Sequence, residues 1–153
     1  FTYVFAVAIP NHLWGEVGEY IFYFITMIAG VIIWLSNYEN KNEGNAVKAK
    51  TLSPLGFILT GLCFLAISYL LTAILFNTTD PMPFYDSITT VAPFVAQILL
   101  TFGYREQWAF WVIEDIFSVI MFALLGNWIM TIQYVFWTIN CIYGWYKWTE
   151  AKE

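Results

Sequence analysis

Long apolar stretches separated by short polar segments dominate the chain. A helix needs about 20 apolar residues to cross the hydrocarbon core of a bilayer. Five stretches approach this length, and they are residues 17–37, 53–77, 86–103, 107–125 and 128–148. Residues 1–9 are apolar but too short, and we interpret them as the end of a further helix. The pattern predicts an all-α integral membrane protein.

The composition supports this prediction and excludes other classes of protein. Of the 153 residues, 60% are hydrophobic and 11% are charged, whereas soluble domains carry about 25% charged residues. The apolar content is too high for a disordered chain. Six Lys and Arg against eleven Asp and Glu leave no basic patch for nucleic acid.

The basic residues predict the orientation of the helices. All six fall on one side of an alternating topology, and they are Lys41, Lys48, Lys50, Arg105, Lys147 and Lys152. Basic loops stay in the cytoplasm. We therefore expect a multi-pass membrane protein with its C-terminus in the cytoplasm. The Gly126-Asn127 pair predicts a tight turn between two antiparallel helices.

An internal repeat relates the first and last whole spans. The two spans match at one constant offset along the sequence. The matching residues of the first are Trp14, Tyr20, Phe22, Ile25, Ile28, Gly30 and Trp34, and those of the last, in the same order, are Trp128, Tyr134, Phe136, Ile139, Ile142, Gly144 and Trp148. The chain crosses the membrane an even number of times between the two copies. Both copies therefore point the same way, as parallel repeats do.

The repeat predicts two parallel three-helix bundles joined by a linker transmembrane helix. In this plan, residues 1–37 are the remainder of the first bundle and residues 38–52 a cytoplasmic loop. Residues 53–77 form the linker helix, residues 86–148 the second bundle, and residues 149–153 a cytoplasmic tail. We expect the first bundle to be incomplete in this chain.

Polar and aromatic side chains share faces of three predicted helices. Such groups are costly in a bilayer and usually face the protein interior or a water-filled cavity. The three stripes are Asp86, Thr90, Pro93 and Gln97; Trp108, Trp111, Asp115 and Phe122; and Gln133, Trp137, Asn140 and Gly144. They predict a site for a small polar ligand with a flat ring.

Simpler roles for these residues stay open. Tryptophans at the ends of spans anchor helices at the membrane interface, and Trp108 fits that role as well as the site. Asn140 could join helices by a hydrogen bond, and Gly144 could permit close helix contact. Pro93 predicts a kink and a hinge.

The chain offers no catalytic set or metal site. Its one histidine, His12, lies in a predicted loop, and Cys63 and Cys141 lie within apolar runs as packed thiols. We expect no enzyme, no cofactor and no metal.

The second bundle resembles the C-terminal helices of the PnuC family of nicotinamide riboside transporters. The resemblance rests on Asp86 with the threonines after it, Ala96-Gln97, the WxxW pair of Trp108 and Trp111, Asp115 and the terminal GWYKW. It implies a fold similar to that of the SWEET sugar transporters and a location in a bacterial inner (plasma) membrane.

The resemblance also implies a ligand and a transport mode. Nicotinamide riboside would bind near the midplane, with Trp108 and Trp111 stacked on its pyridinium ring and Asp115 complementing its charge. Gln97 and Asn140 would bind the carboxamide or ribose hydroxyls. Transport would be facilitated diffusion with alternating access. The predicted substrate-binding residues are Thr90, Gln97, Trp108, Trp111, Asp115, Tyr134, Trp137 and Asn140.

Three other functions remain open at this level. A thiamine transporter of the same fold would bind an equally flat, cationic vitamin. A non-transporting vitamin-binding membrane subunit would keep the site but not the transport. A structural membrane protein would turn its aromatic residues toward lipid. Besides the vitamin, we expect the lipid bilayer as a partner, and the sequence is compatible with a homo-oligomer.

Overall fold

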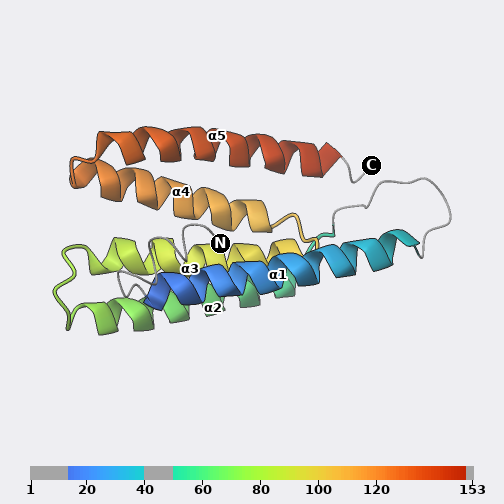
Figure 1. Cartoon of the computed structure of the whole chain (residues 1–153), viewed down its shortest axis with the longest axis horizontal. Coiled ribbons are helices and arrows are strands. Elements are labelled where there is room, and N and C mark those ends of the chain that lie inside the picture. Colours follow the sequence, from blue (N-terminus) through green and yellow to red (C-terminus); the bar gives the residue numbers. More distant parts are fainter. Residues whose placement is uncertain (1–13, 40–49, 151–153) are drawn as a thin grey trace. The chain divides into compact units, whose positions relative to one another are not determined.

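The described part of the chain consists of five helices. The computed structural model describes residues 14–39 and 50–150 (Figure 1). Its helices are α1 (Trp14–Glu39), α2 (Pro54–Leu75), α3 (Pro83–Thr101), α4 (Gln107–Leu124) and α5 (Trp128–Glu150). Each of the five predicted spans corresponds to one of them, so the all-α prediction is confirmed. The predictions for residues 1–9, and for most of the loop 38–52 and of the tail 149–153, lie outside the described residues.

The chain divides into two units, Phe1–Val47 and Lys48–Glu153. In the first unit, α1 is a 26-residue helix whose large apolar side chains, Met27 among them, are mostly exposed. The second unit contains α2 to α5. The predicted parallel relation between the repeats depends on how α1 and α5 are placed, and it stays a prediction.

The four helices of the second unit form a single row (Figure 1). α2 packs on α3, α3 on α4 and α4 on α5, whereas α3 and α5 make no contact in the described structure. The helix α4 therefore has a protein neighbour on each of two sides. The apolar core of the row includes Phe64 of α2, Ala92 and Ala96 of α3, and Phe110 of α4.

Local sequence signals set the ends of these helices. Ser53 precedes Pro54, and its hydroxyl accepts a hydrogen bond from the Gly56 N–H at 3.0 Å, which caps the start of α2. Gly103 and Gly126 follow α3 and α4 with φ of 77° and 72°. This left-handed conformation ends a helix, and glycine adopts it without steric cost. The predicted tight turn at Gly126-Asn127 is confirmed.

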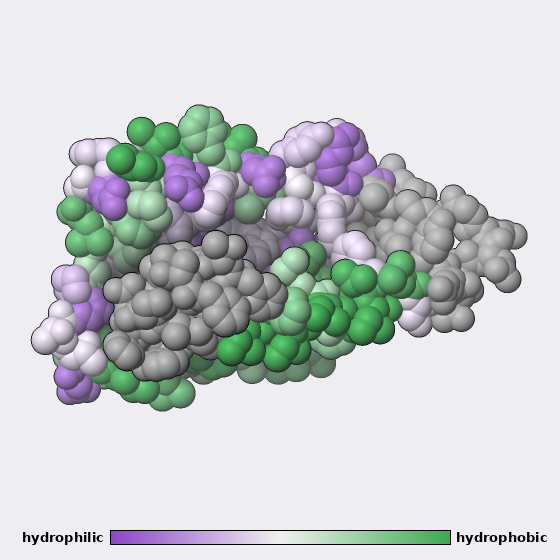
Figure 2. Space-filling model, in the orientation of Figure 1, coloured by the Kyte–Doolittle hydropathy of each residue, from purple (hydrophilic) through white to green (hydrophobic). Residues whose placement is uncertain are grey.

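Many large apolar side chains are exposed on the helices, as a lipid environment requires. α2 and α4 are long and apolar enough to cross a membrane, and the exposed side chains of α2 include Leu55, Phe57 and Leu65. Figure 2 shows hydrophilic residues at the end that carries the α2–α3 turn, at the C-terminal end of α5 and in patches along the α5 side. The two helices α2 and α4 agree with the prediction of a membrane protein. By the same criterion α3 and α5 are less apolar, and they are the helices that carry most of the predicted polar stripes.

Candidate functional site

Buried polar side chains are concentrated on α4. The exposed fraction of the residue is 1% for Gln107, 7% for Glu114, 2% for Asp115 and 1% for Ser118. Charged and amide groups within a membrane helix are costly, and they mark functional sites more often than packing sites. The middle of α4 is therefore the centre of the candidate site.

The indole of Trp111 is held by its own helix. Its Nε1–H donates a hydrogen bond to Oε1 of Gln107, one turn earlier, at 2.7 Å. The Nε2 of Gln107 is buried and has no hydrogen-bond partner. The hydrogen bond orients the indole. Because Trp111 is only half-buried, part of its side chain also stays exposed.

The two adjacent carboxylates of α4 have different surroundings. The Asp115 carboxylate lies beside the thiol of Cys141 on α5, and its Oδ2 is buried without a hydrogen-bond partner. Glu114 accepts a hydrogen bond from the Ser118 hydroxyl at 3.0 Å. Neither side chain is turned toward lipid. An acceptor such as Oδ2 of Asp115 is costly to bury alone and is available to a ligand donor or a cation.

Trp108 lies between α4 and α5. Its six-membered ring covers Gly144, and its ring centroid lies 5.9 Å from that of Trp148 in an edge-on arrangement. Its Nε1 is buried and has no hydrogen-bond partner. Gly144 thus permits a close helix contact, as the sequence indicated, and the structure identifies the Trp108 indole as the group in contact.

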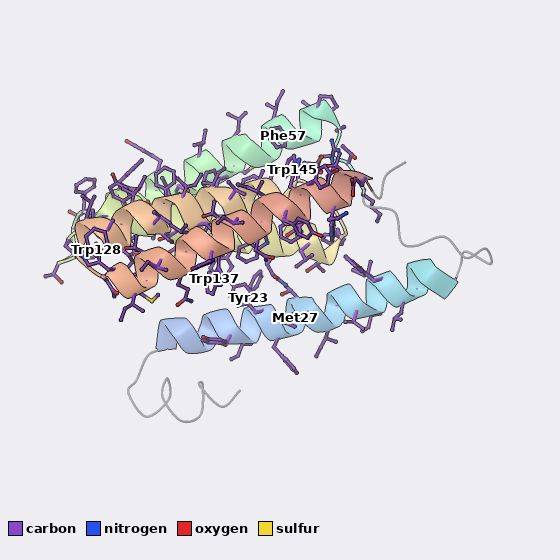
Figure 3. The ribbon with its side chains drawn as sticks, turned by 90° about the horizontal axis from the view of Figure 1, so that it is seen from above. Tyr23, Met27, Phe57, Trp128, Trp137 and Trp145 are labelled. Carbon is purple, nitrogen blue, oxygen red and sulfur yellow. The ribbon has the colours of Figure 1, made fainter. Side chains whose placement is uncertain are left out.

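A second aromatic group lies nearer the α4–α5 turn. The rings of Phe122 and Tyr134 stack, with centroids 5.5 Å apart and planes 15° apart. Trp137 meets Tyr134 edge-on at 5.1 Å and is 48% exposed. Figure 3 shows Trp128, Trp137 and Trp145 along α5, with Trp128 at the turn and Trp145 toward the C-terminal end. Tyr134 and Trp137 therefore lie together.

The predicted residues of α3, and Asn140 of α5, differ in whether they are buried. Gln97 is buried on α3, the helix that packs against α4, and Pro93 is buried in the interior of the same helix. Thr90 and Asn140 are exposed. The structure thus places Trp108, Asp115, Tyr134 and Trp137 along the α4–α5 pair, whereas Trp111 packs against the core that α4 forms with α2 and α3. Gln97 lies on α3, which packs against the other side of α4.

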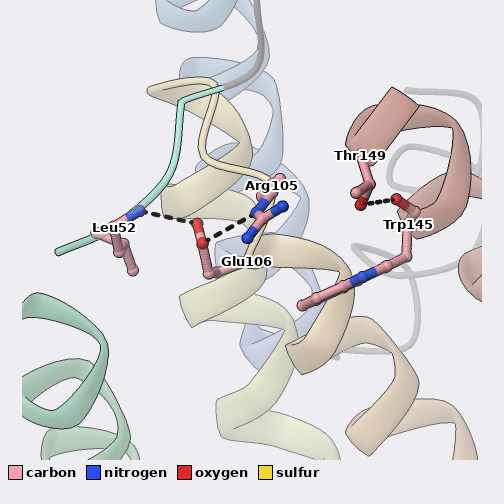
Figure 4. Close-up of polar contacts among 5 residues, drawn as sticks. All are labelled: Leu52, Arg105, Glu106, Trp145 and Thr149. Atoms are coloured by element: carbon pink, nitrogen blue, oxygen red, sulfur yellow. Dashed lines mark hydrogen bonds and ion pairs between the residues drawn. The ribbon is translucent and has the colours of Figure 1, made fainter. Parts of the chain in front are cut away.

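Sequence reasoning missed a buried carboxylate at the start of α4. Glu106 accepts a hydrogen bond from the Leu52 N–H and pairs with Arg105 (Figure 4). Gln107 and the Glu114–Ser118 pair were missed as well. The spacing of four residues in Gln107–Trp111 and Glu114–Ser118 is the signal that could have found them, because side chains four apart are neighbours on a helix.

Comparisons with known proteins agree on one family. A family model described as nicotinamide mononucleotide transporter matches residues 1–150. A protein of Haemophilus influenzae named nicotinamide riboside transporter PnuC is 28% identical over 151 residues, which are 98% of this chain and 66% of the relative. A protein of Escherichia coli with the same name is 39% identical over 72 residues, which are 47% of this chain and 30% of the relative.

A solved structure has the same fold. The crystal structure of the vitamin B3 transporter PnuC matches with a TM-score of 0.57 and 28% sequence identity. The match covers 69% of this chain and 48% of the solved chain. The chain thus spans less than two thirds of the length of each of these relatives.

Proposed function

This chain belongs to the nicotinamide mononucleotide transporter family, and from that membership we propose that it carries nicotinamide riboside across a membrane. The proposed mode is facilitated diffusion with alternating access. The protein is then a carrier and not an enzyme. The observation that carries the proposal is the buried Asp115 carboxylate on the same face of α4 as the indoles of Trp108 and Trp111.

The charges of the described helices favour the riboside over its phosphorylated form. The pyridinium ring of nicotinamide riboside is cationic, whereas the mononucleotide adds a phosphate. Within the described helices, Lys147 is the one basic residue, and it is half-exposed at the end of α5. A phosphate needs arginine, lysine or a helix N-terminus as its partner. The two buried carboxylates Glu114 and Asp115 would instead repel it.

The geometry suggests which groups would contact each part of the ligand. Trp111 presents a partly exposed indole with a fixed orientation, which suits stacking on the pyridinium ring. Cation–π attraction there amounts to about 0.5–2 kcal/mol. Asp115 would complement the ring charge. We propose Gln97 and Asn140, with Thr90, Tyr134 and Trp137, for the carboxamide and ribose.

The row of helices suggests how the site would open and close. Because α3 and α5 each pack on α4 but not on one another, a change of either contact would alter access to α4. We propose Pro93 as the hinge of α3. Proline removes one helical hydrogen bond and weakens the helix at that point.

The described basic residues support the proposed orientation. Lys50, Arg105 and Lys147 lie at the same end of the α2–α5 row, opposite the α2–α3 turn that contains Asp80 (Figure 1). By the positive-inside rule, this end lies in the cytoplasm. We propose a bacterial inner membrane location with the C-terminus in the cytoplasm.

Uptake into liposomes tests the proposal. The purified full-length protein should accumulate labelled nicotinamide riboside to equilibrium, without an ion gradient or ATP. The mononucleotide and thiamine, supplied in excess, should compete poorly. Preferential uptake of thiamine would identify the rival carrier, and tight binding without uptake would identify a binding subunit. Either result would overturn the proposed function.

A further inference from the structure

The contact between Gly144 and Trp108 is unusually close for two neighbouring helices. A Cβ atom added to Gly144 would lie 2.6 Å from Cη2 and Cζ2 of Trp108 and 2.8 Å from Cζ3. Nearly equal distances to three consecutive ring atoms place this Cβ over the face of the ring and not at its edge. Carbon atoms in contact are about 3.5–4.0 Å apart. Any larger residue at position 144 must therefore displace the indole by about 1 Å.

Shape alone fixes this ring. The Nε1 of Trp108 is buried and has no hydrogen-bond partner, so no polar contact orients the indole. Gly144 covers one ring face, and Trp148, one turn further along α5, meets the ring edge-on. The position of the indole therefore depends on the absence of a side chain at Gly144.

The two indoles of the WxxW pair are thus positioned by different means. Trp111 is oriented within α4 by its hydrogen bond to Gln107. Trp108 lies three residues earlier on the same helix face and is positioned from α5 by Gly144. A planar ligand that contacts both rings requires both arrangements together.

We infer that Gly144 is a positioning residue for the proposed riboside site, because it sets where the ring of Trp108 lies relative to Trp111. This inference rests on the proposed function. Gly144 does not touch the ligand; it acts through Trp108. The substitution G144A should therefore reduce ligand affinity by moving the indole, and a smaller ring at position 108 should relieve the effect.

A double-mutant cycle tests the inference in the full-length protein. Binding of nicotinamide riboside is measured for wild type, G144A, W108F and the double variant. G144A should raise Kd about tenfold or more, in keeping with the cost of a displacement near 1 Å in a site. In the W108F background, the same substitution should change Kd by less than about twofold. The matched control is G61A on α2, where an added Cβ meets nothing within 4 Å.

Each outcome is decisive. Equal effects of G144A in both backgrounds, or an unchanged Kd in G144A, would overturn the inference while leaving the proposed function intact. Absence of binding by the wild type would instead overturn the proposed function. If G144A does not fold, recovery of a monodisperse, ligand-binding protein in the W108F/G144A variant supports the contact. Failure of that double variant to recover refutes it.

Discussion

The carboxylate of Glu106 binds the backbone of Leu52, 54 residues earlier in the chain. Oε2 accepts a hydrogen bond from the Leu52 N–H at 3.1 Å, and Oε1 lies 3.4 Å from Nε of Arg105. Backbone hydrogen bonds from Lys50 to Gly103 and from Arg105 to Lys50 lie beside this contact. The segment before α2 is thereby fixed to the α3–α4 loop.

Replacing Glu106 tests the strength of this connection. E106A should destabilise the protein by about 1–3 kcal/mol, because the Leu52 N–H loses its partner. E106Q should cost less, since its amide oxygen still accepts that hydrogen bond. Melting temperature and amide hydrogen exchange at residues 50–53 measure the effect. Equal melting temperatures for E106A and wild type would contradict the prediction.

Removing the indole of Trp111 should weaken binding without unfolding the protein. W111A removes a cation–π contact of about 0.5–2 kcal/mol together with its stacking area, so Kd for nicotinamide riboside should rise about tenfold or more. W111F should lose less, because it keeps an aromatic ring. The matched control is W128A, since Trp128 is 64% exposed at the start of α5. An unchanged Kd in W111A would remove Trp111 from the site.

Neutralising Asp115 should act on the charge of the ligand. D115N keeps the shape of the side chain but removes its attraction for a pyridinium ring, so affinity for nicotinamide riboside should fall about tenfold. Affinity for benzamide riboside, which has a neutral ring of the same shape, should change little. D80N, in the α2–α3 turn, is the control. Equal losses for both ligands would show that Asp115 acts through packing and not through charge.

Substituting Pro93 should separate transport from binding. P93A restores the N–H that can bond to the Thr89 carbonyl, which stiffens the middle of α3. Kd should stay within about twofold, while the initial rate of liposome uptake should fall roughly threefold to tenfold. Equal rates for P93A and wild type would show that Pro93 is not a hinge.

Much of the fold follows from local properties of the chain. The apolar stretch 53–77 predicted α2, observed as Pro54–Leu75, and the Gly126-Asn127 pair predicted the turn between α4 and α5. Such signals depend on hydrophobicity over one span or on the conformational freedom of one residue. They need no knowledge of what lies beside the helix.

The contacts of the site depend on distant segments, and the sequence predicted them less well. Glu106 resembled an ordinary loop residue, because its partner Leu52 is 54 positions away. Helical periodicity placed Asp115 on the face of Trp108 and Trp111, but it gave no indication that Glu114 is buried as well. Gly144 was expected at a close contact, yet periodicity named no partner.

The sequence by itself predicted a helical membrane protein, the bounds of its five described helices to within about three residues, and the aromatic and acidic residues that share a face of α4. Tertiary structure alone decided that Asp115 lies beside Cys141, that Trp108 covers Gly144, and that Glu106 binds Leu52. The reason is physical. Hydrophobicity and helix periodicity can be read from one segment of the sequence. Which helix faces pack against each other depends instead on shape and hydrogen bonding between segments far apart in the chain.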